Sequence, residues 1–217
     1  MKTLVVAVAG LTALASGLAA QQRLHGTAFA DGSIVRWGTK LGGADAGSFG
    51  GPAFGLHASG SLAKFTLSAE YVEGRLQLKS GSPPDSAAHD LVEARMVLGV
   101  QPVPWLALGV GPTIRAFVTD SETVRWVLWQ VRARAQGPLP STPLETYVEL
   151  WYALSAKVNL PEPVDHVQGG EAGVVLRPPG SAVWFRLGYR IDGAQLASGG
   201  RSESVEAVSF ALGIGGR

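Results

Sequence analysis

The stretch from Thr142 to Leu160 constrains the fold more than any other part of the chain. Its even-numbered positions are almost all apolar, whereas the odd-numbered ones include Glu145, Glu149 and Lys157. A period of two predicts a β-strand, because a helix would mix the two sets on every face. Strands of soluble proteins average roughly 5–6 residues. A transmembrane strand needs about 9–11 residues that alternate between lipid and lumen, so the length and pattern favour a membrane-crossing strand.

The same alternation recurs along the chain between clusters of turn-forming residues. It predicts an all-β, closed, antiparallel up-and-down transmembrane barrel of ten strands, or of eight if the first or second segment is not a barrel strand. The ten segments are 24–37, 53–59, 63–78, 91–100, 106–119, 124–136, 142–160, 171–177, 182–192 and 205–215.

The connections between these segments also alternate. Those after odd segments look long and polar, at 39–51, 79–90, 159–170 and 193–204, with only 120–123 short. Those after even segments look tight, at 59–62, 101–104, 137–141 and 178–181. An even strand number then puts both termini at the end with short turns, which is the layout of outer-membrane barrels.

The polar face is expected to line the lumen and the apolar face to meet lipid. In the segments 106–119 and 205–215, the polar face is also rich in Gly and Ala, as a narrow lumen requires. This orientation is the reverse of that in a soluble barrel.

The amino terminus predicts a cleaved secretory signal over residues 1–20, with residues 21–217 forming the barrel domain. Lys2 is followed by the apolar run Leu4 to Leu14 and by the small residues Ala19 and Ala20. A membrane-anchor helix is the alternative, but the run is short for one. No later run reaches 18 apolar residues without a charge, which argues against a helical membrane protein.

Composition removes several classes of function. The chain has no cysteine, so a disulfide framework is excluded. Lys2 lies in the signal, and the 17 remaining basic residues balance the 17 acidic ones. A neutral chain gives no electrostatic reason to expect nucleic acid as a partner.

The chain resembles the small bacterial outer-membrane β-barrels, in plan similar to the OmpA- and OmpX-like group. The resemblance covers the whole chain and rests on the signal, the strand plan and a final strand from Val208 to Ile214. It implies a Gram-negative-type outer membrane, with membrane lipids and the barrel-insertion machinery as partners.

Charged residues of the inward faces are expected to pair across neighbouring strands. Ten strands enclose a lumen only slightly wider than side chains can fill, and an unpaired shielded charge is costly. Arg132 and Arg134 are expected beside Glu145 and Glu149, Glu171 beside Arg186 and Arg190, and Glu93 beside Arg115. These pairs predict a mostly closed polar core. If the barrel is open, a porin-like path would instead be lined by Arg115, Arg132, Arg134, Glu145, Glu149, Glu171, Arg186 and Arg190.

Enzymatic motifs are incomplete. His57-Ala58-Ser59 has the His-x-Ser spacing of lipid A deacylases, but Gly60 stands where that family has Asn. Asp165-His166 resembles only part of an omptin-like protease site, and no paired acids accompany it. We identify no catalytic residues, no metal-ligand spacing and no cofactor motif.

The preferred function is a structural or surface-interaction role, in which long outside loops contact an external ligand. The first alternative is a narrow channel for small or amphiphilic solutes. The second is a barrel enzyme acting on lipid, although we expect no enzymatic activity.

Overall fold

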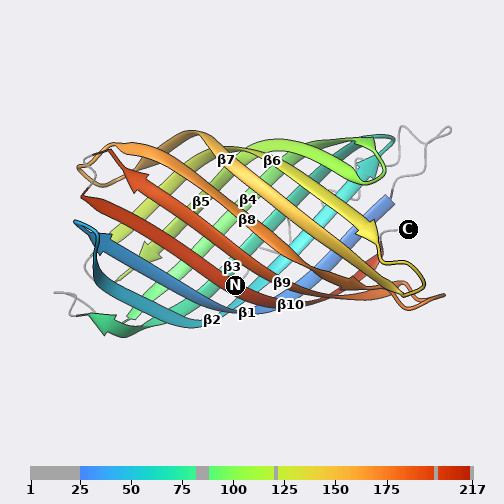
Figure 1. Ribbon diagram of the computed structural model, residues 1–217, viewed down its shortest axis with the longest axis horizontal. Coiled ribbons are helices and arrows are strands. Elements are labelled where there is room, and N and C mark those ends of the chain that lie inside the picture. The colour runs from blue at the N-terminus through green and yellow to red at the C-terminus, as the bar shows by residue number, and fades with distance from the viewer. Residues whose placement is uncertain (1–24, 82–87, 120–121, 198–199, 216–217) are drawn as a thin grey trace, which may run out of the picture.

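The structure, a computed structural model, describes residues 25–81, 88–119, 122–197 and 200–215, and these form a ten-stranded β-barrel (Figure 1). The predicted signal over residues 1–20 lies outside the described residues. The strands are β1 (His25–Leu41), β2 (Ala44–Leu62), β3 (Phe65–Gly81), β4 (Ala88–Val103), β5 (Leu106–Val118), β6 (Thr123–Pro138), β7 (Leu144–Val158), β8 (Val164–Leu176), β9 (Val183–Leu196) and β10 (Arg201–Gly215).

Every strand pairs antiparallel with its neighbours in sequence, and β1 pairs with β10 to close the barrel. The closing ladder runs from Thr27 opposite Gly215 to Leu41 opposite Arg201. The barrel of ten strands is therefore confirmed over the alternative of eight. We call the end where β1 begins and β10 ends the terminal end, and the opposite one the distal end.

The described residues include no helix that is long and apolar enough to cross a membrane.

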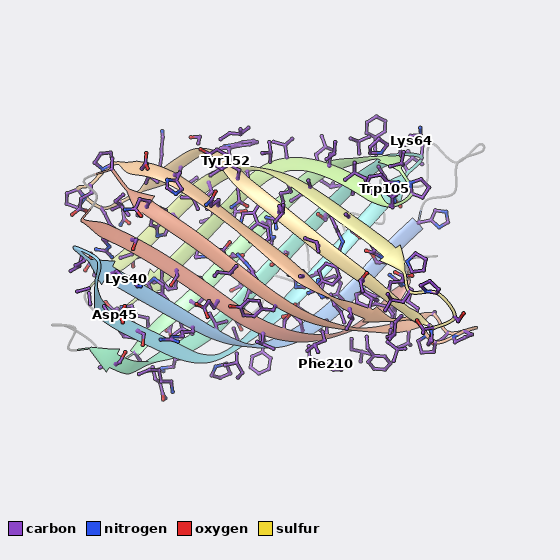
Figure 2. All side chains as sticks on the ribbon, in the orientation of Figure 1. Lys40, Asp45, Lys64, Trp105, Tyr152 and Phe210 are labelled. Carbon is purple, nitrogen blue, oxygen red and sulfur yellow. The ribbon has the colours of Figure 1, made fainter. Side chains whose placement is uncertain are left out.

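The outer surface of the barrel is apolar, as predicted. Ile34, Leu98, Leu150 and Phe210 each expose half or more of their area, and similar side chains lie on every strand. Figure 2 shows side chains projecting outward along the whole barrel, Tyr152 and Phe210 among them. Apolar area of this extent on a monomer marks a surface that lipid or another apolar partner covers.

Leu150→Arg is expected to lower the free energy of unfolding in lipid by about 2–4 kcal/mol, because it places a charge on the lipid face. Leu150 is 60% exposed and lies between the outward Val148 and Tyr152. Urea titrations in vesicles would measure the change, with Ser141→Arg, in the exposed turn at 139–143, as the control. Equal stability of the two variants, or recovery of the wild-type chain as a soluble monomer without detergent, would contradict a membrane-spanning barrel.

The predicted difference in connection length is wrong. The strands continue through most of the residues read as long loops, leaving connections at 42–43, 82–87, 119–122, 159–163 and 197–200 at the distal end. Those at the terminal end are 63–64, 104–105, 139–143 and 177–182.

Glycine caused this error, because some glycines mark close approaches between strands instead of turns. A Cβ atom on Gly51 would lie 2.1 Å from the carbonyl oxygen of Arg75 on β3. Only glycine fits there, and its segment pairs with β1 as a regular strand, from Val35 opposite Gly51 onward.

The sequence pattern predicted one phase of alternation throughout the stretch Thr142 to Leu160, but the structure shows that the phase changes within it. The pairing register shifts between Trp129 and Gln130, whose partners are Ser155 and Ala153, so Leu154 is an extra residue. Such a β-bulge reverses the direction in which the following side chains point. Ala156 and Val158 therefore pack against the interior, although they share even numbers with the lipid-facing residues.

Candidate binding site in the barrel interior

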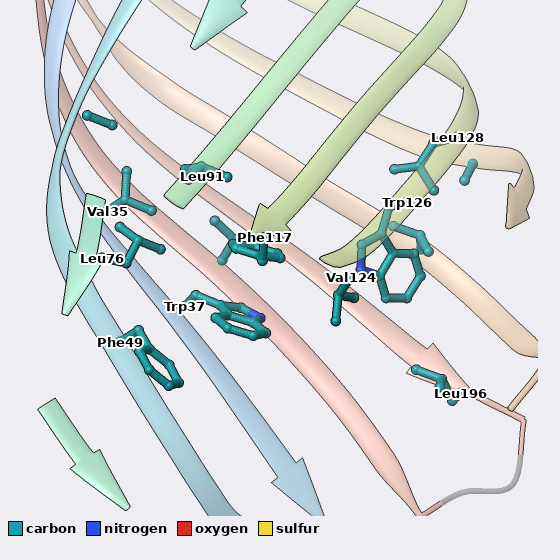
Figure 3. Packing of buried hydrophobic residues seen from close by; sticks show 14 residues of the cluster. Val35, Trp37, Phe49, Leu76, Leu91, Phe117, Val124, Trp126, Leu128 and Leu196 are labelled. Carbon is teal, nitrogen blue, oxygen red and sulfur yellow. The ribbon is translucent and has the colours of Figure 1, made fainter. Parts of the chain in front are cut away.

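The distal part of the lumen is filled by apolar side chains that come from all ten strands. We call this cluster the apolar plug (Figure 3). Its members are Val35, Trp37, Phe49, Ala53, Leu76, Leu91, Phe117, Val124, Trp126, Leu128, Ala153, Val167, Leu196 and Val205.

The centre of the apolar plug is an aromatic stack. The Trp37 ring lies parallel to that of Phe117, with centroids 4.1 Å apart, and stacks on Phe49 at 5.3 Å. His89 contacts Trp37 and Phe49 edge-on. The predicted polar core is therefore wrong at this end, because the inward positions of the distal strand segments are apolar.

A buried cluster of charges lies next to the apolar plug. The Glu93 carboxylate accepts hydrogen bonds from Arg115 Nε at 2.6 Å and from Arg190 Nη1 at 2.8 Å. Asp192 accepts from Arg115 Nη2 at 2.7 Å and lies 2.8 Å from Arg190 Nη2. The two acids and two arginines thus neutralise one another across β4, β5 and β9.

Trp151 links this cluster to the arginines of β6. Its indole Nε1 donates to Asp192 at 2.7 Å, and the Arg132 guanidinium lies 4.4 Å from the centre of its ring. Arg132 also donates to Glu149 at 2.6 Å and to Gln130 at 2.9 Å. Trp151 therefore supplies both a donor and an aromatic face for cation–π contact to the ionic network.

Nearer the terminal end, His57 lies between two carboxylates. His57 Nε2 is 2.5 Å from Asp31, and Nδ1 is 3.1 Å from Glu70. The imidazole stacks on Phe29 with centroids 3.9 Å apart, and Glu70 also accepts a hydrogen bond from Arg95. Both nitrogens of the ring are thus engaged by acids.

All eight residues predicted to face the lumen lie on the inner face, but their partners differ in part from those expected. The pairs Glu93–Arg115, Arg132–Glu149 and Arg134–Glu149 form at 2.6, 2.6 and 3.4 Å. Glu171 lies 3.7 Å from Arg186.

Two expected pairings are wrong. Glu145 is opposite Pro138 in the register, beyond the two arginines, and contacts Gln136 and Arg177 instead. Arg190 is opposite Glu171 in the register, yet its long side chain reaches across the lumen to Glu93.

A cavity of about 500 Å³ occupies the lumen on the terminal side of the apolar plug. We call it the vestibule. Its wall extends from the exposed Gln101, near the turn at 104–105, to Val35, Leu91 and Val205 of the apolar plug. Its charged lining consists of Asp31, His57, Glu70, Glu93, Arg95, Arg132, Arg134, Glu149, Glu171, Arg177, Arg186 and Arg190.

The geometry does not assemble either of the enzymatic motifs. His57 contacts Asp31 and Glu70, while the Ser59 hydroxyl is 2.5 Å from that of Thr27, so Ser59 has no base. Asp165 and His166 form an exposed pair on β8 at 2.9 Å. Within the described ranges, no group of three or more His, Asp or Glu side chains is arranged to hold a metal ion.

The sequence pattern missed several residues of this network. Asp31 was missed because the segment 24–37 has no regular alternation around Asp31-Gly32. Its inward direction follows from its contact with His57. Arg95 and Asp192 lie on the polar faces of their predicted strands, so they could have been predicted as lumen residues from the alternation alone.

The fold and its apolar outer face define a class, the outer-membrane-type transmembrane β-barrel. Strands of 13 to 19 residues exceed the length needed to cross the bilayer, about 9–11 residues. Closure leaves no free strand edge, and a sheet that spans a membrane must have none, because its backbone groups cannot bond to water there.

Among solved structures, the chain is similar to Neisserial surface protein A, at 12% identity and a TM-score of 0.43, over 86% of this chain and 96% of that one. It is also similar to the translocator domain of autotransporter NalP from Neisseria meningitidis, at 13% identity and a TM-score of 0.49, over 98% and 95% of the two chains. A third similar structure is an outer membrane channel from Pseudomonas putida F1, at 8% identity and a TM-score of 0.47, over 89% and 96%. No protein-family model matches the sequence, and a search of curated proteins finds no match.

Proposed function

We propose that this protein is a non-conducting outer-membrane barrel with a structural or surface-interaction role. The apolar plug carries the proposal, because all ten strands contribute to it and its side chains are buried. Water and ions do not cross a packed apolar constriction readily.

The role at the cell surface rests with the distal rim instead of long loops. By the plan of this class, the terminal end faces the periplasm and the distal end faces outward. The distal rim carries exposed charges, such as the pairs Lys40–Asp45 and Arg75–Asp90. An external ligand would therefore meet strand ends and short connections.

A narrow channel for small solutes is the second candidate, supported by the vestibule. A cavity of about 500 Å³ already extends from the terminal end to the apolar plug. Conduction would require only that the apolar plug rearrange.

Planar-bilayer recording distinguishes these two functions. We expect the refolded wild-type barrel to give no discrete current steps, because the apolar plug blocks the distal lumen. An open porin refolded in parallel would control for insertion. Discrete steps that disappear in Arg132→Ala would contradict the closed barrel and favour the channel, since Arg132 lines the vestibule.

A further inference from the structure

The vestibule contains more hydrogen-bond donors than its own acidic side chains use. Its wall includes six arginines and five acids. The five acids are each hydrogen-bonded within the network. Asp31 pairs with His57, Glu70 and Glu93 with arginines, Glu149 with Arg132, and Glu171 with Tyr147.

Arg186 is the least satisfied of the six arginines. Its nearest carboxylate oxygens belong to Asp31 at 3.6 Å and Glu171 at 3.7 Å, which is beyond hydrogen-bonding distance. Its Nε is buried without a partner, and its guanidinium lies 4.6 Å from the centre of the Phe29 ring. A guanidinium has five N–H donors, so Arg186 retains its capacity to bind an acceptor.

Arg134 is the most exposed of the arginines at this level of the lumen. Its side chain is 27% exposed. It donates to Gln136 from Nε at 3.2 Å and from Nη2 at 3.0 Å, and its contact with a carboxylate, Glu149, is long at 3.4 Å. It lies over the ring of Tyr147, whose hydroxyl donates to Glu171, the neighbour of Arg186. Arg134 and Arg186 are therefore connected through one Tyr147–Glu171 pair.

The deeper arginines show the same excess of donors. Arg95 and Arg190 each leave Nε without a partner, and Arg132 leaves Nη2. The side chains of Arg95 and Arg132 are nine-tenths or more buried. Buried donors are normally satisfied, so this group of open N–H bonds calls for acceptors that the chain does not supply.

We propose that the vestibule binds a small organic anion, whose carboxylate or phosphate oxygens accept hydrogen bonds from Arg186 and Arg134. The planar guanidinium suits such groups, because it can donate two parallel hydrogen bonds. The volume of about 500 Å³ is in the range of small-molecule sites, about 300–1,000 Å³. Phe29 and Trp184 also line the vestibule and add apolar surface to its wall.

Calorimetric titration of the refolded barrel in detergent tests this proposal. Benzoate combines a carboxylate with a flat apolar body, phenyl phosphate replaces the carboxylate, and benzyl alcohol removes the charge. We expect saturable binding of at least one anion, no binding of benzyl alcohol, and at least a tenfold loss of affinity in Arg186→Gln. Arg75→Gln is the matched control, because it removes the same charge from an exposed site at the distal end.

Arg134→Gln is the second variant, and it decides the test if Arg186→Gln does not regain the gel mobility of a folded barrel. Affinity that is unchanged in the folded variants, or equally reduced in Arg75→Gln, would overturn the proposal. The proposal would also be overturned if neither anion binds at a concentration about 20-fold above a weak Kd of about 1 mM. Because binding is measured without ion flow, the result is independent of whether the barrel conducts.

Discussion

Glu93→Gln is expected to destabilise the folded barrel by about 3–5 kcal/mol, because it leaves buried arginines without their counter-charge. Glu93 is only 3% exposed. Its carboxylate accepts hydrogen bonds from Arg115 and Arg190, and lies 3.7 Å from Arg95. Glutamine keeps the size of the side chain and removes the charge. Asp192 alone would then face Arg115 and Arg190. Urea-induced unfolding in lipid vesicles, followed by tryptophan fluorescence, would measure the loss.

Glu145→Gln is the control for Glu93→Gln. Glu145 makes the same kind of contact with one arginine, Arg177, but both side chains are about one-quarter exposed. Solvent screens such a pair, so its loss should cost no more than about 1 kcal/mol. A similar cost for both variants would show that the Glu93 cluster is far better solvated than its burial implies.

Trp37→Ala and Phe117→Ala are each expected to cost about 3–5 kcal/mol, because they leave voids in the apolar plug. The two rings are parallel and 4.1 Å apart, so the effects should not add in the double variant. We also expect the double variant to give current steps in planar bilayers, since the voids would join the vestibule to the distal rim.

Phe210→Ala separates the loss of packing from the loss of an aromatic ring. Phe210 faces outward and is 56% exposed, so lipid can fill the space that its ring leaves. Its replacement should cost clearly less than that of Phe117. If the Trp37 and Phe117 variants were as stable as Phe210→Ala and passed no current, the aromatic stack would not be what closes the lumen.

Alternation along single strands predicted the fold because it reports a local property. Leu150 and Glu149 point to opposite faces for the same reason that any two adjacent strand residues do. Repeating this pattern ten times indicated the strand number, the apolar outer face and most of the charged inner face. The fold class follows from those three together.

Other features depend on pairing between strands, which a single sequence does not display. The bulge at Leu154 reverses the phase of β7 through its register with β6. Gly51 appeared to belong to a loop, but it lies in β2, and it is glycine because the Arg75 carbonyl leaves no room for a Cβ atom. The pairing of β7 with β6 and of β2 with its neighbours determines both features, whereas the glycine content of the sequence suggested a turn.

The partners inside the lumen were the hardest to predict, because they lie on strands that are not adjacent. Arg190 and Glu93 are 97 residues apart in sequence and meet across the barrel. Trp37 and Phe117 meet in the same way, from β1 and β5. Such contacts depend on the diameter and stagger of the closed barrel. The register between neighbouring strands does not contain this information, and it therefore paired Arg190 with Glu171 incorrectly.

With the distal end facing outward, as proposed above, its short connections determine how an antibody could recognise this protein. By the bounds of the described strands, the longest distal connection is that at 82–87. An epitope there has to combine the ends of several strands, which are brought together only by closure of the barrel. Antibodies raised against the folded protein should therefore bind intact cells but lose the antigen after denaturation, and antibodies to linear peptides should show the opposite preference.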